Sequence, residues 1–138
     1  MGKKVKRPPM SRSENMARIR AKDTKPEMRV RRALWANGLR YRLHVRALPG
    51  CPDLVFTSRR TVVQVRGCWW HQHPGCVAAK IPRTRTAWWA AKLQRNVERD
   101  TQADAELRSA GWQVIVIWEC ETKRSECIAA VVDKLKRS

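Results

Sequence analysis

The 138-residue sequence has little acidic charge and no long apolar run. Twelve Asp and Glu stand against thirty Lys and Arg, which gives a formal net charge of +18 and a pI near 11.0. No apolar stretch approaches the roughly 18 residues of a membrane span. The basic N-terminus lacks the apolar segment of a secretory signal, so we expect a cytoplasmic protein. The charge favours a polyanionic partner, nucleic acid first and an anionic membrane surface second.

Tyrosine and phenylalanine are also scarce, with one residue each, whereas tryptophan occurs seven times. Large flat rings in a basic protein can wedge between bases, and they also fill cores. Five cysteines in an intracellular chain favour metal ligands or buried thiols over disulfides. The length allows one domain with a modest core. We expect a disordered basic tail over residues 1–10 and a single domain over residues 11–138.

Hydrophobic periodicity predicts a run of strands between helices. The expected strands are Leu39–Leu43, Asp53–Phe56, Thr61–Arg66 and Trp112–Trp118, of which the last is the most apolar and should be central. The expected helices are a short one carrying Met16 and Ile19, one opened by a capping box at Thr24–Glu27 and ended by Asn37-Gly38, one from a capping Thr86 to Ala110, and one over Ser125–Lys136. This order indicates the α/β class, with a mixed sheet flanked by helices.

Three soft metal ligands lie close together in the chain, Cys68, His73 and Cys76. Zinc favours four thiolate or imidazole ligands in a tetrahedron, and a closed set of four is structural because no position is left for water. Cys120, just past the most apolar strand, is the preferred fourth ligand, with Cys51 and Cys127 as alternatives. The alternative is that Cys68, His73 and Cys76 lie in one loop by chance and bind no metal.

Candidate catalytic residues lie on both sides of this loop. Pro52-Asp53 before one strand and Gln64 to Arg66 on the next are similar to the acidic pattern that holds a divalent ion in many nucleases, although Gln and Arg replace the usual acid and Lys. The alternative for Asp53 is a turn-capping aspartate. His71 could move a proton between an attacking water and a leaving oxygen. It could equally be a surface histidine or replace His73 as a zinc ligand.

Local structure alone offers a plain interpretation of Glu27 and of the Trp69-Trp70 pair. Glu27 lies in the first turn of a predicted helix, where a capping role is the local expectation. The tryptophan pair could belong to the core. Because a pair on an irregular polar loop is hard to bury on both sides, we expect at least one ring to face DNA.

Several motifs together resemble one family, the Vsr very-short-patch-repair endonucleases. The resemblance runs in order from Ser11 to the C-terminus. It rests on the segments Arg20–Thr24, Leu48–Asp53, Gly67–Cys76, Asn96–Asp100 and Gly111–Cys120. It implies a fold related to type II restriction endonucleases with a structural zinc. It also implies Mg²⁺-dependent hydrolysis of one strand of double-stranded DNA on the 5′ side of the T in a T:G mismatch, the product of 5-methylcytosine deamination.

The resemblance assigns roles to individual residues. Asp53 would bind Mg²⁺ with the main-chain carbonyl of Val65, His71 would be the catalytic histidine, and Glu27 a supporting acid. The implied zinc ligands are Cys68, His73, Cys76 and Cys120. The implied DNA contacts are the wedge Trp69 and Trp70, and the apolar residues Met16 and Ile19 of an N-terminal arm.

Two positions depart from the family pattern. Arg66 stands where the family usually has histidine. Arginine can supply positive charge to DNA but cannot act as a base. Pro74-Gly75 adds one residue before Cys76, a spacer that still lets both ligands reach one zinc.

Rival functions remain open at this stage. One is a restriction-like endonuclease without mismatch preference, another is a zinc-containing DNA-binding protein that has lost catalysis, and a third is a plain basic scaffold protein. For the favoured interpretation we expect a monomer that associates with the bacterial nucleoid when bound to DNA, with mismatch-repair proteins as further partners and no membrane.

Overall fold

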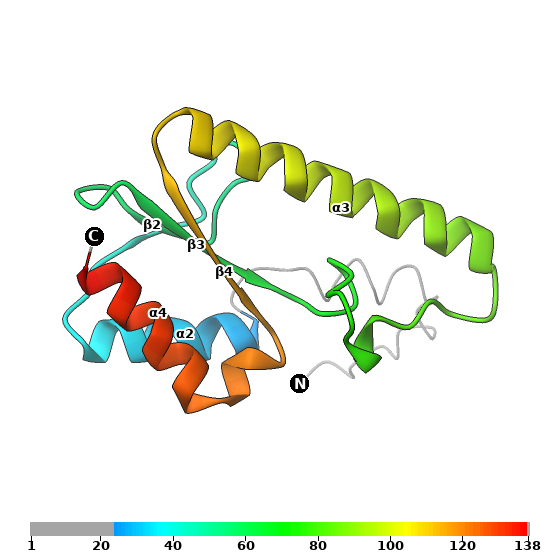
Figure 1. Ribbon diagram of the computed structural model, residues 1–138, viewed down its shortest axis with the longest axis horizontal. Helices are drawn as coiled ribbons and strands as arrows, with labels where there is room; N and C mark the ends of the chain where they lie inside the picture. Colours follow the sequence, from blue (N-terminus) through cyan, green and yellow to red (C-terminus); the bar gives the residue numbers. More distant parts are fainter. Residues whose placement is uncertain (1–23, 138) are drawn as a thin grey trace, which may run out of the picture.

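The computed structural model describes residues 24–137, which form a mixed β-sheet between layers of helices (Figure 1). This confirms the predicted α/β class. The helices in this range are α2 (Lys25–Ala36), α3 (Thr86–Ser109) and α4 (Ser125–Lys136), with short 3₁₀ helices at Val77–Ala79 and Glu121–Lys123. The strands are β1 (Arg42–Leu43), β2 (Leu54–Phe56), β3 (Thr61–Arg66) and β4 (Gln113–Trp118).

The sheet has the order β1-β2-β3-β4. The first three strands are antiparallel neighbours, whereas β3 and β4 are parallel, with Val63 opposite Ile115 and Arg66 opposite Trp118. The prediction that the most apolar strand is central is therefore wrong, since β4 lies at the edge of the sheet formed by residues 24–137. Its apolar residues face helices on both sides of the sheet, and burial on both faces gives an edge strand the composition of a central one.

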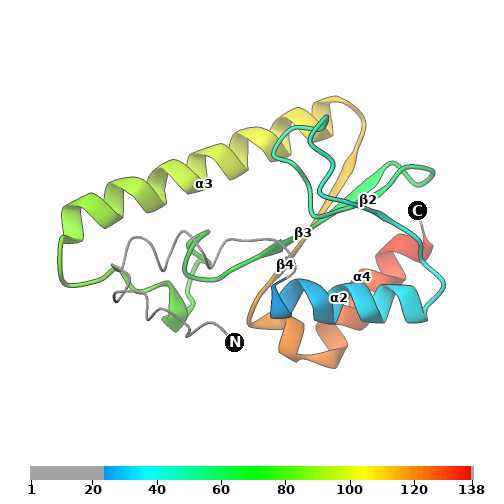
Figure 2. The ribbon, with the colours of Figure 1, turned by 180° about the vertical axis from the view of Figure 1, so that it is seen from behind.

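Alternating side chains of the strands enter two cores. Val63, Ile115 and Ile117 pack with Leu34 of α2 and Leu135 of α4 on one face. On the other face, Val55 and Val62 pack with Leu107 of α3 and with Trp112. Figure 2 shows the same layering from behind, with α2 and α4 together and α3 opposite.

Local signals explain most helix boundaries. The Thr24 hydroxyl accepts the N–H of Glu27 at 3.4 Å, so α2 begins at its predicted cap. Thr86 does not cap α3. Arg85 precedes the helix with φ of 52°, and the Thr86 hydroxyl donates to the carbonyls of Pro82 and Arg83 instead. Of the strand expected at Leu39–Leu43, only Arg42–Leu43 pairs. Within residues 24–137, no helix has the length and apolar character to cross a membrane.

Candidate active site and metal centre

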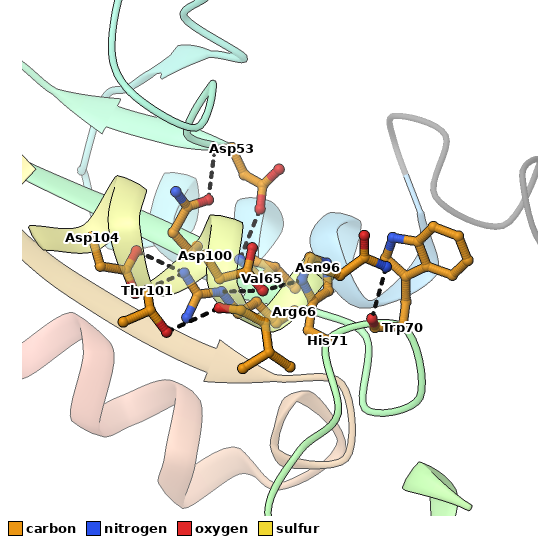
Figure 3. Close-up of polar contacts among 11 residues, drawn as sticks. Asp53, Val65, Arg66, Trp70, His71, Asn96, Asp100, Thr101 and Asp104 are labelled. Atoms are coloured by element: carbon orange, nitrogen blue, oxygen red, sulfur yellow. Dashed lines mark hydrogen bonds and ion pairs between the residues drawn. The ribbon is translucent and has the colours of Figure 1, made fainter. Parts of the chain in front are cut away.

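A cleft of about 730 Å³ opens where the end of β3 meets α2 and α3. Its walls come from five segments that are far apart in the sequence: the start of α2, the turn before β2, the residues from the end of β3 into the following loop, one face of α3, and Glu119 just after β4. Asp53, Val65, Arg66, His71 and Asp100 all line it. Figure 3 shows how these side chains lie. All three predicted catalytic residues, Glu27, Asp53 and His71, thus line one cleft.

Asp53 is held by the backbone around it. Its carboxylate Oδ2 accepts the N–H of Val65 at 2.8 Å, and its own N–H donates to the side-chain oxygen of Gln64 at 3.4 Å. Its carbonyl accepts the N–H of His44 at 3.0 Å. Burial raises the pKa of Asp53 from 3.8 to about 6, although the Val65 N–H works in the opposite direction. A desolvated carboxylate of this kind is stabilised by a nearby cation.

Glu27 lies next to Asp53 and is paired. It is buried at 4% exposure, its Oε1 lies 3.0 Å from Nε2 of His44, and its Oε2 accepts from Arg31 at 3.3 Å. Ligand atoms of Glu27, His44 and Asp53 all lie within 4.8 Å of one another. Sequence reasoning missed His44. A signal exists in the composition, because the chain has only three histidines and His44 is one of them.

His71 is oriented by a carboxylate from helix α3. Its Nδ1 lies 2.6 Å from Oδ2 of Asp100, and its backbone N–H donates to Gly67 at 3.1 Å. Asn96, one turn before Asp100, donates to the carbonyl of Trp70 at 3.4 Å and so ties the loop to the helix. Asp100 ends the sequence motif Asn96–Asp100, which by itself assigns it no role. Its spacing of four residues from Asn96 places both on one helix face.

Arg66 is engaged with protein carboxylates. Its Nη2 donates to both oxygens of Asp104 on α3, at 2.7 and 2.9 Å, and its side chain is 11% exposed. The charge of Arg66, expected to serve DNA binding, therefore has a partner within the chain.

The four expected zinc ligands come together at the other end of the loop. Ligand atoms of Cys68, His73, Cys76 and Cys120 lie within 4.8 Å of one another, and the alternatives Cys51 and Cys127 are outside this group. His73 Nδ1 lies 3.6 Å from Sγ of Cys68 and 3.5 Å from Sγ of Cys120. A tetrahedral zinc, with bonds of about 2.3 Å to sulfur and about 2.0 Å to nitrogen, sets such atoms about 3.6 Å apart.

The chemistry of this group also fits zinc. Three thiols and one imidazole are soft ligands that select zinc over magnesium. Burial raises the pKa of the Cys68 thiol to about 12, so a thiolate there needs a cation beside it. The ring of His73 stacks on Trp118 at 4.3 Å, which orients its Nδ1 toward the cysteines.

The two tryptophans of the loop differ in their surroundings. Trp70 lines the cleft. The Trp69 ring packs edge-on against the buried Trp89, and its indole N–H donates to the carbonyl of Lys80 at 2.9 Å. Met16 and Ile19, the expected contacts of the N-terminal arm, lie outside the described residues.

Comparisons with known proteins agree on one family. The family model described as DNA mismatch endonuclease Vsr matches residues 6–77. A type II nicking enzyme of Xanthomonas oryzae pv. oryzae, V.XorIIP, is 45% identical over 82% of this chain and 82% of its own. The DNA mismatch endonuclease Vsr of Escherichia coli is 40% identical over 84% of this chain and 74% of its own. V.NmeAIP, a type II nicking enzyme of Neisseria meningitidis, is 40% identical over 91% and 89%.

Proposed function

The chain belongs to the Vsr family of DNA mismatch endonucleases, and we propose that it cuts one DNA strand on the 5′ side of the T in a T:G mismatch. Such mismatches arise when 5-methylcytosine deaminates, and the cut would begin very-short-patch repair. The observation that carries the proposal is the cleft in which Asp53 lies together with the His71–Asp100 pair. The net charge of +18 supports duplex DNA as the substrate.

We propose Mg²⁺ as the cofactor held by Asp53, with Glu27 as a supporting acid and the carbonyl of Val65 as a main-chain ligand. Carboxylate and carbonyl oxygens are the ligands that Mg²⁺ prefers. The raised pKa of Asp53 supports this, because a buried carboxylate gains most from a divalent cation. The bound ion would lower the pKa of a water and stabilise negative charge on the phosphate.

His71 is the proposed proton acceptor. When Nδ1–H of His71 donates its hydrogen bond to Asp100, the neutral imidazole keeps Nε2 as its basic nitrogen. Nε2 can then take a proton from the attacking water. Asp100 keeps the ring in this tautomer and stabilises the positive charge that develops on it, the role of the carboxylate in other carboxylate–histidine pairs.

The zinc is proposed to be structural. Cys68, His73, Cys76 and Cys120 would hold it with four protein ligands, which leaves no position for a reacting water. His71 lies between two of these ligands in the chain, so a rigid site would also restrict the backbone of the proposed base.

DNA binding is assigned to the basic surface and to the tryptophan that faces the cleft. Lysine and arginine contacts to phosphates position a protein without reading sequence. Trp70 is the preferred wedge, since Trp69 is already packed on Trp89. Inserting a ring costs less at a mismatch than at a paired step, which favours mismatched duplexes. Met16 and Ile19 remain proposed contacts in the opposite groove.

The described residues contain one such cleft with one set of catalytic groups, which supports a monomer that nicks one strand. Its substrate would place it in the bacterial cytoplasm at the nucleoid. Mismatch-repair proteins are the proposed further partners.

A nicking assay tests the function directly. Duplexes with T:G, C:G or T:A at one position are incubated with the protein, with and without Mg²⁺. We expect a single cut, 5′ to the T, of the T:G duplex only and only with Mg²⁺. Equal cutting of all three would indicate a restriction-like endonuclease, and mismatch binding without any cut would indicate a DNA-binding protein that has lost catalysis.

Two variants complete this assay. Asp53→Ala should abolish the cut and keep mismatch binding, because it removes the metal ligand but no phosphate contact. Asp133→Ala removes a carboxylate from the exposed face of α4 and should cut like the parent chain.

A further inference from the structure

Arg66 links the end of β3 to helix α3 through a buried ion pair. One guanidinium nitrogen donates to both carboxylate oxygens of Asp104, at 2.7 and 2.9 Å. The two side chains are only 11% and 10% exposed. A charge-assisted contact shielded from water has a fixed geometry, unlike an exposed ion pair.

The same guanidinium approaches the carboxylate that holds His71. Nε of Arg66 is 4.0 Å from Oδ2 of Asp100, the oxygen that lies 2.6 Å from Nδ1 of His71 (Figure 3). Asp100 and Asp104 are one helical turn apart, a spacing at which two negative charges repel each other. The guanidinium lies close to both and offsets this repulsion. This contact therefore helps to keep the Asp100 carboxylate directed at the histidine.

Only the C-terminal part of helix α3 rests on the sheet, whereas Trp89 near its start packs on the loop after β3. Its 24 residues span about 36 Å. Leu107 is buried in the core formed with Val62 and Trp112, whereas the N-terminal part of the helix extends beyond the sheet (Figures 1 and 2). Asp104 lies one turn before Leu107, and Asp100 lies one turn further into the extended part.

Two consecutive residues of β3 thus hold the two halves of the site. Val65 donates its N–H to the carboxylate of Asp53, the proposed metal ligand. Arg66 binds Asp104 and approaches Asp100, on the helix that orients the proposed base. The distance between Asp53 and the His71–Asp100 pair therefore depends on the contact between helix α3 and the end of β3.

We infer that Arg66 is a positioning residue, which aligns the His71–Asp100 pair with Asp53 by fastening α3 to β3 through Asp104. The inference rests on the proposed function, since it assigns a role in the same reaction. It requires that loss of the contact lowers turnover and leaves DNA affinity unchanged. A DNA-contacting Arg66 would give the opposite pattern.

The test is the paired substitution Arg66→Met with Asp104→Leu. Replacing both members of a buried ion pair with apolar side chains of similar size usually preserves the fold, whereas removing one leaves a buried charge unpaired. We expect kcat on the T:G duplex to fall about 10- to 100-fold, because misplacing catalytic groups by about 1 Å has an effect of this size. The Kd for the duplex and the Tm should stay near those of the parent chain.

Two further variants separate positioning from general effects. Glu106→Leu with Arg108→Met removes the same number of charges from an exposed part of α3 and should leave kcat unchanged. Arg66→Lys keeps the charge but loses the planar guanidinium, and should recover part of the lost kcat.

A paired variant with the kcat of the parent chain would overturn the inference. So would a loss of DNA affinity that matches the loss of kcat, or a Tm that falls as steeply.

Nuclear magnetic resonance gives a readout that does not depend on cleavage, the Nδ1 proton signal of His71 in its hydrogen bond to Asp100. This signal should be present in the parent chain and lost in the paired variant, and its persistence there would also refute the inference. If the parent chain cuts no duplex while the signal behaves as expected, the proposed function fails and the positioning role stands.

Discussion

Replacing Asp53 with asparagine should stabilise the Mg²⁺-free protein while it abolishes cleavage. Burial raises the pKa of Asp53 from 3.8 to about 6, so the folded protein resists ionising this side chain. Each pKa unit corresponds to about 1.4 kcal/mol, so the ionised carboxylate destabilises the fold at pH 8 by at most about 3 kcal/mol. Asparagine has the same shape, and its side-chain oxygen can accept the N–H of Val65 that Asp53 accepts at 2.8 Å.

The pH dependence follows from the sign of this shift. Between about pH 4 and pH 6 the folded protein binds the proton of Asp53 while the unfolded chain has released it, so the stability of the parent chain falls as pH rises through this window. The difference between Asp53→Asn and the parent chain should be largest at pH 8. It should shrink to about one third of that value at pH 4.5 and vanish below about pH 3.

Urea unfolding at pH 8 and pH 4.5 measures this difference, with zinc retained and Mg²⁺ omitted. Adding Mg²⁺ at about 100 times its Kd should stabilise the parent chain by about 2.7 kcal/mol and leave Asp53→Asn unchanged. Asp133→Asn, on the exposed face of α4, controls for the loss of one charge and should show neither effect. An asparagine variant no more stable than the parent chain at pH 8, or a gain that increases toward low pH, would refute the reasoning.

Four other substitutions test the remaining groups of the site. Cys120→Ser should lower both the bound zinc and the Tm, because the binding energy of a closed site is folding energy; a variant that keeps full zinc and full Tm contradicts this role. Trp70→Ala should reduce the preference for T:G over matched duplex by roughly tenfold, whereas Trp69→Ala, which loses packing on α3, should mainly lower the Tm; equal losses of preference would show that both rings are wedges. Asp100→Asn should lower kcat by about 10²- to 10⁴-fold with little change in Kd, because the amide no longer selects the reactive tautomer of His71; single-turnover kinetics and duplex titration separate the two quantities.

Elements with local signals were predictable from the sequence. The N-cap Thr24 and the glycine at position 111 mark helix ends in both sequence and structure, although the Glu27 side chain binds His44 and Arg31 and does not complete a capping box. The place of β4 in the sheet was not predictable, because an apolar strand covered on both faces by helices looks the same at an edge as in the middle. Strand order is decided by connections between distant elements, and short patterns do not encode those.

In the candidate site, too, some residues were predictable from local motifs and others were not. Asp53, His71 and the four zinc ligands stand in recognisable motifs, and the structure brings them into one cleft and one cluster. The partners His44 and Asp104 carry no motif. Arg66 and Asp104 are 38 residues apart, and their pairing appears only when α3 lies beside the end of β3. Side chains that orient others are chosen by tertiary packing, so a sequence pattern identifies the reacting group more readily than its support.

The parallel pairing of β3 and β4 explains how the two centres share one short loop. Arg66 lies opposite Trp118 where the pairing ends, so the residues two positions later, Cys68 and Cys120, leave the sheet side by side. The N–H of Cys120 donates to the sulfur of Cys68 at 3.4 Å. A zinc ion at this end would fasten the irregular backbone that follows, three residues before His71 presents its ring to Asp100. The register of β3 and β4 therefore determines where the proposed base lies.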